Sequence, residues 1–80
     1  MTIKIFTTGG TIDKTYFDKK SEYQVGEPQA AGVLERANVF IGYDVVEIVR
    51  KDSLEMNDSD RSLIKSVIES DSADKIIITH

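Results

Sequence analysis

A glycine pair flanked by threonines is the part of this sequence most able to do chemistry. Thr8-Gly9-Gly10-Thr11-Ile12 directly follows the mostly apolar residues 3–7. Glycine lets the backbone take a positive φ and lets a ligand approach the main chain closely. A threonine held in such a loop can act as a nucleophile when a base lies within reach. The stretch therefore predicts a ligand-binding or catalytic loop, although a purely structural turn fits the same residues.

The glycine spacing excludes two common nucleotide-binding loops. A dinucleotide-binding loop needs the pattern G-x-G-x-x-G, and a phosphate-binding loop needs a Gly-Lys-Ser/Thr ending. Neither pattern surrounds Gly9 and Gly10. What the loop does therefore depends on the elements that bring other side chains to it.

Composition and charge narrow the class of protein. The chain has 80 residues, a net charge of −4 and a pI of about 4.8, and so lacks the basic surface of a nucleic-acid-binding protein. It has no cysteine and one histidine, which excludes disulfides and thiolate zinc sites and argues against a histidine-rich metal site. No stretch approaches the roughly 20 apolar residues that cross a bilayer, and no long apolar signal core is present. We expect a cytoplasmic protein with no metal, no cofactor, no nucleic-acid partner and no membrane association.

Three short apolar runs predict strands. They span residues 2–8, 43–49 and 75–79, and they are rich in β-branched residues. The second run is almost continuously apolar, which is typical of a strand covered on both faces. Residues 9–26 are polar and predict a long loop, a kind of segment that is usually functional or disordered.

Two helices are expected between these strands. Pro28 suits the first turn of the first helix, because its missing N–H costs little there. Asn57 and Asp60 have the spacing of a capping box, so the second helix should begin near Asp58. Its buried face is the apolar set Leu63, Ile64, Val67 and Ile68. A helix exit and turn are expected at residues 38–42.

The order β-loop-α-β-α-β predicts an α/β fold with a parallel sheet and right-handed crossovers. Parallel sheets need helices on both faces, and two helices can hardly cover three strands. We therefore expect residues 1–80 to be a partial N-terminal α/β domain that is truncated after its third strand.

With the elements in this order, four stretches resemble signatures of the bacterial-type L-asparaginase and glutaminase family. They are the Thr8-Gly9-Gly10-Thr11-Ile12 loop, residues 21–26 with a tyrosine before Val-Gly, residues 52–58 with a serine shortly before Met-Asn-Asp, and residues 76–80, which approach the second signature. The resemblance extends over essentially all 80 residues, about the first quarter of a family member. It implies that the chain begins a flavodoxin-like or Rossmann-like domain.

The resemblance also implies roles for four residues. Thr11 matches the nucleophile that attacks a side-chain amide, so that an acyl-threonine forms and ammonia leaves before water releases the acid. Tyr23 matches the loop tyrosine that closes over the substrate and assists Thr11. Ser53 matches a residue that holds the substrate α-carboxylate, and the N–H groups of Gly10 and Thr11 can face the developing oxyanion. The implied reaction is hydrolysis of L-asparagine, or of L-glutamine, without a cofactor.

The sequence departs from the family pattern in three ways. Asp13 stands where the family often has a small residue, and Leu54 stands where many members place a polar residue that grips the substrate. The threonine and aspartate of the second signature, and a later lysine, are not among these residues, so we expect the 80-residue chain alone to be inactive. His80 is expected to be a structural neighbour of that signature rather than a general base.

Two other functions stay open. One is a non-catalytic module that binds a small amino acid through the same loops and needs Thr11 only for binding. The other is an amidase subunit acting on amidated transfer RNA, against which the acidic charge argues mildly. Family members are usually homodimers or tetramers, and an unfinished parallel sheet leaves edge strands, so a homo-oligomer is expected.

Overall fold

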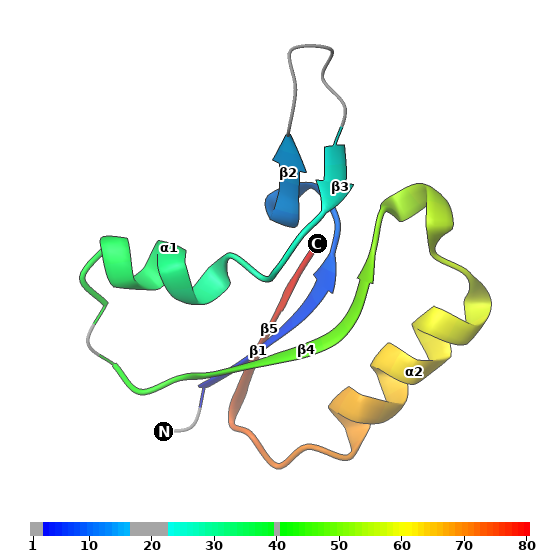
Figure 1. Cartoon of the computed structure of the whole chain (residues 1–80). Coiled ribbons are helices and arrows are strands. Elements are labelled where there is room, and N and C mark those ends of the chain that lie inside the picture. The colour runs from blue at the N-terminus through cyan, green and yellow to red at the C-terminus, as the bar shows by residue number, and fades with distance from the viewer. Residues whose placement is uncertain (1–2, 17–22, 40) are drawn as a thin grey trace.

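The computed structural model describes residues 3–16, 23–39 and 41–80, and every structural statement below concerns those residues. Its helices and strands are β1 (Ile3–Gly9), β2 (Lys14–Tyr16), β3 (Tyr23–Val25), α1 (Ala30–Arg36), β4 (Asp44–Lys51), α2 (Asp58–Glu69) and β5 (Lys75–Thr79) (Figure 1). Two short 3₁₀ turns, Thr11–Asp13 and Ser53–Glu55, follow β1 and β4. None of the described helices is long and apolar enough to cross a membrane.

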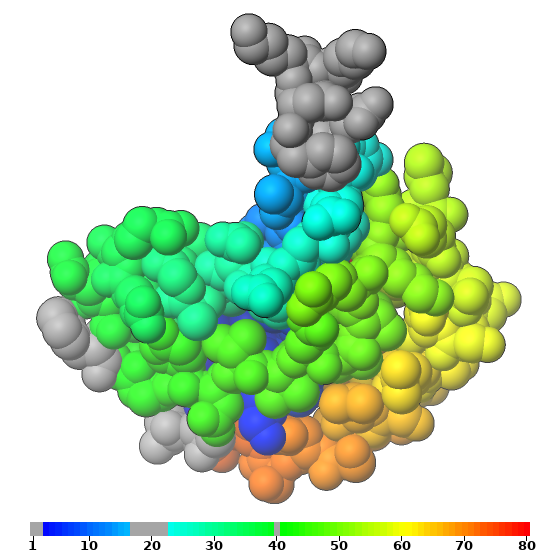
Figure 2. All heavy atoms as spheres, in the orientation of Figure 1, coloured from blue at the N-terminus to red at the C-terminus, as the bar shows by residue number. Residues whose placement is uncertain are grey.

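β1 is the central strand of a parallel three-stranded sheet with the order β4-β1-β5. Ile5 pairs with Val45 on one edge of β1 and with Ile77 on the other. Because both edges are occupied, residues 5–9 are all buried, and Figure 2 shows β1 largely hidden behind β4. The predicted α/β class with a parallel sheet is confirmed.

The strand order reverses direction at β1. The chain passes from β1 to β4 on one side and then crosses to β5 on the other side. This is how a flavodoxin-like order begins, and such sheets bind ligands beyond the carboxyl ends of the two strands at which the order reverses. β1 and β5 end at Gly9 and Thr79 on the same side of the sheet (Figure 1), and the glycine pair lies close to His80 there.

The two helices cover opposite faces of the sheet. On one face Ile77 lines a cavity of about 170 Å³ together with Leu34 of α1. On the other face Ile78 lines a cavity of about 250 Å³ together with Ile64 of α2. The alternation of side chains along a strand explains why neighbouring residues face different helices. Coverage is incomplete, since Ile77 is 50% and Ile78 52% exposed.

The prediction of a long loop at residues 9–26 was wrong in part, because β2 and β3 form an antiparallel pair there. Tyr16 pairs with Tyr23, and their ring centroids lie 5.7 Å apart. The ammonium group of Lys14 lies over the Tyr23 ring, 4.3 Å from its centroid. Cross-strand aromatic contacts of this kind stabilise a short ladder that is too brief to recognise from periodicity. Residues 17–22, which include part of the second family-like stretch, lie outside the described residues.

The N-terminus of α2 is fixed by neighbouring residues, whereas that of α1 is fixed by a residue distant in sequence. α2 begins at Asp58 with the predicted capping box: the Asp60 amide donates to Asn57 Oδ1 at 2.9 Å, and the Asn57 amide donates to Asp60 Oδ2 at 3.0 Å. α1 begins at Ala30 rather than at Pro28. The Gln29 amide at its N-terminus donates to Asp13 Oδ1 at 2.9 Å, a contact from a distant segment.

The end of β4 differs from the sequence prediction, and the turn expected at residues 38–42 contains a left-handed residue. β4 extends to Lys51, two residues past the predicted end at residue 49, because its last residues still pair with β1. At the predicted turn over residues 38–42, Asn38 takes a φ of 56°, a left-handed conformation that asparagine tolerates. Phe40 of that turn lies outside the described residues.

Candidate functional site

The glycine pair forms the backbone of the crevice. Gly9 has a φ of 88° and Gly10 a φ of 74°, so the predicted need for positive φ is confirmed. A Cβ on Gly9 would lie 2.5 Å from the Lys51 nitrogen, and a Cβ on Gly10 would lie 2.6 Å from Cγ of the His80 ring. Glycine is therefore required at both positions by conformation and by close contact with the ends of β4 and β5.

The Gly10 amide has a structural partner. Its N–H donates to the Lys51 carbonyl at 2.9 Å, and its own carbonyl accepts from the Asp13 amide at 3.2 Å. Of the two N–H groups considered for an oxyanion, that of Gly10 is thus used inside the fold. Gly10 shapes the crevice by letting the His80 ring approach its backbone.

Thr11 opens the 3₁₀ turn immediately after the glycines, and its side chain is exposed. Two residues later, Asp13 is only 1% exposed. Asp13 Oδ1 accepts the amide at the start of α1, and its backbone carbonyl accepts the Gly26 amide at 2.8 Å. The Asp13 side chain therefore holds the turn that carries Thr11 against the start of α1, and the Asp13 backbone holds it against the residue after β3.

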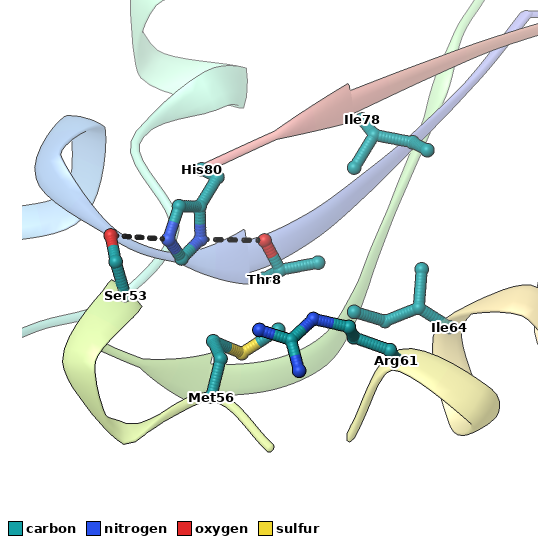
Figure 3. Close-up of a pocket in the computed structure, with 7 residues that line it drawn as sticks. All are labelled: Thr8, Ser53, Met56, Arg61, Ile64, Ile78 and His80. Atoms are coloured by element: carbon teal, nitrogen blue, oxygen red, sulfur yellow. Dashed lines mark hydrogen bonds between the residues drawn. The ribbon is translucent and has the colours of Figure 1, made fainter. Parts of the chain in front are cut away.

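His80 lies between two hydroxyl groups at the centre of the crevice (Figure 3). Its Nδ1 lies 3.0 Å from Thr8 Oγ1, and its Nε2 lies 3.0 Å from Ser53 Oγ. Thr8 also donates its hydroxyl proton to the Thr79 carbonyl at 2.7 Å. The order of the strands brings these residues together, since Thr8 is on β1, Ser53 follows β4 and His80 follows β5.

The cavity of about 250 Å³ opens beside this histidine. Its lining combines the three hydrogen-bonding residues with one cation and three apolar side chains: Thr8, Ser53, Met56, Arg61, Ile64, Ile78 and His80 (Figure 3). A cavity with an apolar floor and a few convergent polar groups is the usual form of a small-molecule site.

Tyr23 contacts Asp52, a residue that is not among those expected at the site. The Tyr23 hydroxyl donates to Asp52 Oδ2 at 2.6 Å. This hydrogen bond to a carboxylate, and then the negative charge itself, raise the pKa of Tyr23 above its usual value, while the charge of Lys14 lowers it. The same bond holds the pKa of Asp52 below its usual range. The signal that was available is the place of Asp52 directly after a strand that ends at the crevice.

The structure brings some of the expected site residues together and leaves others apart. Ser53 is joined to His80, whereas the described contacts of Tyr23 run to Asp52, Lys14 and Tyr16 rather than to Thr11. Leu54 is 94% exposed. Lys51 forms a salt bridge with Asp60 at 2.9 Å, while its neighbour Asp52 accepts the hydrogen bond from Tyr23.

The described residues contain no group of three or more histidine, cysteine, aspartate or glutamate side chains that could hold a metal ion. The chemistry that they can support directly is that of hydroxyl groups, an imidazole, a phenol and a carboxylate.

No protein-family model matches the sequence, and no curated protein matches it either. Among solved structures, the chain is similar to the thermostable L-asparaginase from Thermococcus kodakarensis, with a TM-score of 0.71 and 26% sequence identity. The match covers 100% of this chain and 25% of that enzyme, so the chain spans a quarter of its length. The fold of these residues is therefore asparaginase-like.

Proposed function

We propose that this chain carries the nucleophile of an amidohydrolase that converts L-asparagine to L-aspartate and ammonia. The observation that carries the proposal is the position of Thr11. Its exposed side chain follows two glycines with positive φ at the crevice where β1 and β5 end. Similarity to an L-asparaginase over the whole chain supports the same chemistry.

The proposed reaction runs through an acyl-threonine. Thr11 Oγ1 attacks the amide carbon and its proton passes to a base, which delivers a proton to the amide nitrogen, so that the C–N bond breaks and ammonia leaves. Water then attacks the ester, and Thr11 recovers its proton as L-aspartate departs. A threonine hydroxyl needs an adjacent base for this attack, because it is a weak nucleophile at its ordinary pKa.

Tyr23 and Ser53 have proposed roles beside Thr11. Tyr23 assists the attack, and its bond to Asp52 at 2.6 Å gives the phenol a fixed acceptor for its own proton. Ser53 binds the substrate from the end of β4, opposite Thr8 across the His80 ring. Gly10 acts by allowing the close approach of His80.

The described residues do not provide Thr11 with a hydrogen-bonded carboxylate or lysine. We therefore propose that the 80 residues are the amino-terminal part of a longer active polypeptide, consistent with a match to a quarter of an asparaginase. Self-association is proposed as well, because β5 pairs on one edge only in the described sheet and Ile77 is 50% exposed. Light scattering is expected to show a dimer or a larger assembly, and a compact monomer would contradict this.

Ammonia release tests the function. The polypeptide that carries these residues at its natural length should release ammonia from L-asparagine, and the isolated 80-residue chain should not. Thr11→Ala should lower kcat/KM by more than about a thousandfold, because a covalent nucleophile is lost. Thr11→Ser keeps a hydroxyl and should retain part of the activity. Equal rates for the parent and Thr11→Ala would rule out the proposed role of Thr11.

Covalent capture separates this function from a module that only binds an amino acid. An analogue of L-asparagine with a diazoketone in place of the amide should label Thr11 in the active polypeptide. Reversible binding without labelling would favour the binding module. Ammonia release from amidated transfer RNA, but not from free L-asparagine, would favour an amidase subunit.

A further inference from the structure

A positive charge lies in the same cavity as Ser53. Arg61, near the start of α2, lines the cavity of about 250 Å³ together with Ser53 and His80. Figure 3 shows its side chain extending from α2 toward Met56, which follows the turn that carries Ser53. An arginine side chain cannot be deprotonated in a protein, and it carries five N–H donors in a flat fork. The cavity therefore contains a fixed charge as well as hydroxyl groups.

The rest of the fold engages this guanidinium weakly. Arg61 donates to Asp58 Oδ1 at 3.1 Å, and the two side chains are 63% and 103% exposed. An exposed ion pair contributes at most about 1 kcal/mol, so a ligand can replace it at little cost. Arg50 shows the contrast, because its guanidinium makes three contacts of 2.9–3.3 Å with Glu47. Within the described residues, Arg61 thus keeps most of its donors for a ligand that carries a negative charge.

The turn after β4 supplies polarity without positive charge. The Ser53 hydroxyl lies 3.0 Å from His80 Nε2, and the Met56 amide donates to the Ser53 carbonyl at 3.3 Å. Asp52, the residue before Ser53, is itself a carboxylate, so a second carboxylate at Ser53 meets a like charge. A carboxylate that leaves water for a cavity with an apolar floor is also strongly destabilised unless a cation pairs with it. Ser53 alone cannot supply that charge, whereas Arg61 can.

We propose that Arg61 binds the substrate α-carboxylate together with Ser53 and supplies the positive charge that the serine lacks. The identity of the substrate as L-asparagine rests on the proposed function, whereas the preference of this cavity for a carboxylate rests on the placement of Arg61. A guanidinium matches a carboxylate in shape as well as in charge, because two of its N–H groups can face the two oxygens. Arg61 thereby makes the cavity select ligands that carry a carboxylate over ligands that lack one.

Equilibrium binding measures this preference. Titration calorimetry uses the Thr11→Ala form of the natural-length polypeptide, so that bound amides are not consumed. Succinamate keeps the carboxylate of L-asparagine and lacks its ammonium group, whereas 3-aminopropanamide keeps the ammonium group and lacks the carboxylate. Arg61→Gln should weaken succinamate by about tenfold or more, the usual effect of losing a hydrogen bond between charged groups, and should not weaken 3-aminopropanamide. Unchanged succinamate binding, or equal weakening of both ligands, would overturn the proposal.

Two further variants separate the effect of charge from that of shape and of position. Arg61→Lys keeps the positive charge and loses the flat fork, so it should weaken succinamate less than Arg61→Gln does. Arg50→Gln is the matched control, because it makes the same chemical change at a guanidinium that Glu47 already holds on β4. Succinamate should bind this control as tightly as it binds the protein with both arginines. A loss in Arg50→Gln equal to that in Arg61→Gln would reveal a general effect of net charge and contradict the proposal.

NMR gives a reading that depends on no substitution at Arg61. In the Thr11→Ala polypeptide, the Nε–H signal of Arg61 should move when succinamate is added and stay in place with 3-aminopropanamide. If succinamate leaves the signal unmoved, the proposal is wrong even where Arg61→Gln cannot be folded. Ammonia release answers the separate question of function. Binding of succinamate through Arg61, without ammonia release from L-asparagine by the parent polypeptide, would support the carboxylate site and reject the proposed amidohydrolase.

Discussion

The Tyr23 hydroxyl donates to Asp52 Oδ2 at 2.6 Å across 29 positions of sequence. The next residue, Ser53, contacts the ring of His80 at 3.0 Å. Two adjacent residues after β4 therefore bind one group from β3 and one from the end of β5. The short turn after β4 is the point at which three separate segments of the candidate site are held together.

This contact predicts how Tyr23 titrates. Asp52→Asn removes the carboxylate that raises the pKa of Tyr23, so the pKa should fall toward its ordinary value. Lys14→Met should move it the other way, because the Lys14 charge lowers that pKa. Residue-specific NMR titration of the three tyrosines measures both changes. A Tyr23 pKa that is the same in Asp52→Asn as in the parent would mean that the hydrogen bond is absent in solution.

Stability in acid depends on two other carboxylates. Bonds to Lys51 and Lys4 hold the pKa values of Asp60 and Asp71 below their usual range. In the unfolded chain an aspartate has a pKa of about 3.9, so each group stabilises the fold fully above that pH and loses the effect as the pH falls through its folded-state value. The free energy of unfolding, measured with urea, should fall less between pH 7 and about pH 3 for Asp71→Asn than for the parent. Asp58→Asn is the control, since the Asp58 side chain is fully exposed, and an equal effect of both variants would contradict the assignment.

The stability of the fold at high pH depends on Lys4 in a corresponding way. The hydrogen bond to Asp71 at 2.6 Å raises the pKa of Lys4. A lysine with a raised pKa stabilises the fold fully below its unfolded value of about 10.4, and the effect disappears as the pH rises through the folded value. Asp71→Asn should therefore be least harmful at both extremes of pH and most harmful near neutrality.

The glycine pair should tolerate no side chain. Gly9→Ala and Gly10→Ala each place a Cβ on a residue with positive φ, which costs about 1–2 kcal/mol before any contact is counted. The new Cβ also overlaps the Lys51 backbone or the His80 ring. Gly42→Ala is the matched control, because nothing lies within 4 Å of a Cβ there. Free energies of unfolding from urea denaturation should show a large loss for the first two variants, and a loss for Gly42→Ala as large as theirs would contradict the explanation.

Features that depend on neighbouring residues were predictable from the sequence. The capping box at Asn57 and Asp60 and the positive φ at Gly9 and Gly10 follow from residue types a few positions apart. The contact of His80 with Ser53 was not predictable in this way. It depends on β1 lying between β4 and β5, and a linear sequence specifies the strands more directly than their order.

The hairpin of β2 and β3 was missed for a related reason. Each of its strands has three residues, too few for an alternating pattern to stand out. What defines them is their mutual pairing, including that of Tyr16 with Tyr23, and the contact of Tyr23 with Asp52. Asp13 was likewise noticed only as a departure from a family pattern, although its buried carboxylate fixes the start of α1.

Two buried hydroxyl groups on β1 and β5 give a prediction of increased stability. Thr7 is fully buried and lies beside Thr79 in the parallel register of β1 and β5. Within the described residues neither hydroxyl has a hydrogen-bond partner. A buried polar group without a partner costs about 1–3 kcal/mol, so Thr7→Val, which keeps the branched shape, should raise the free energy of unfolding by about 1 kcal/mol. Urea denaturation measures this change. Thr8→Val is the contrasting variant, because it removes a hydroxyl that donates to the backbone carbonyl of Thr79, and it should destabilise the fold. A destabilised Thr7→Val would show instead that a bound water or a ligand satisfies this hydroxyl.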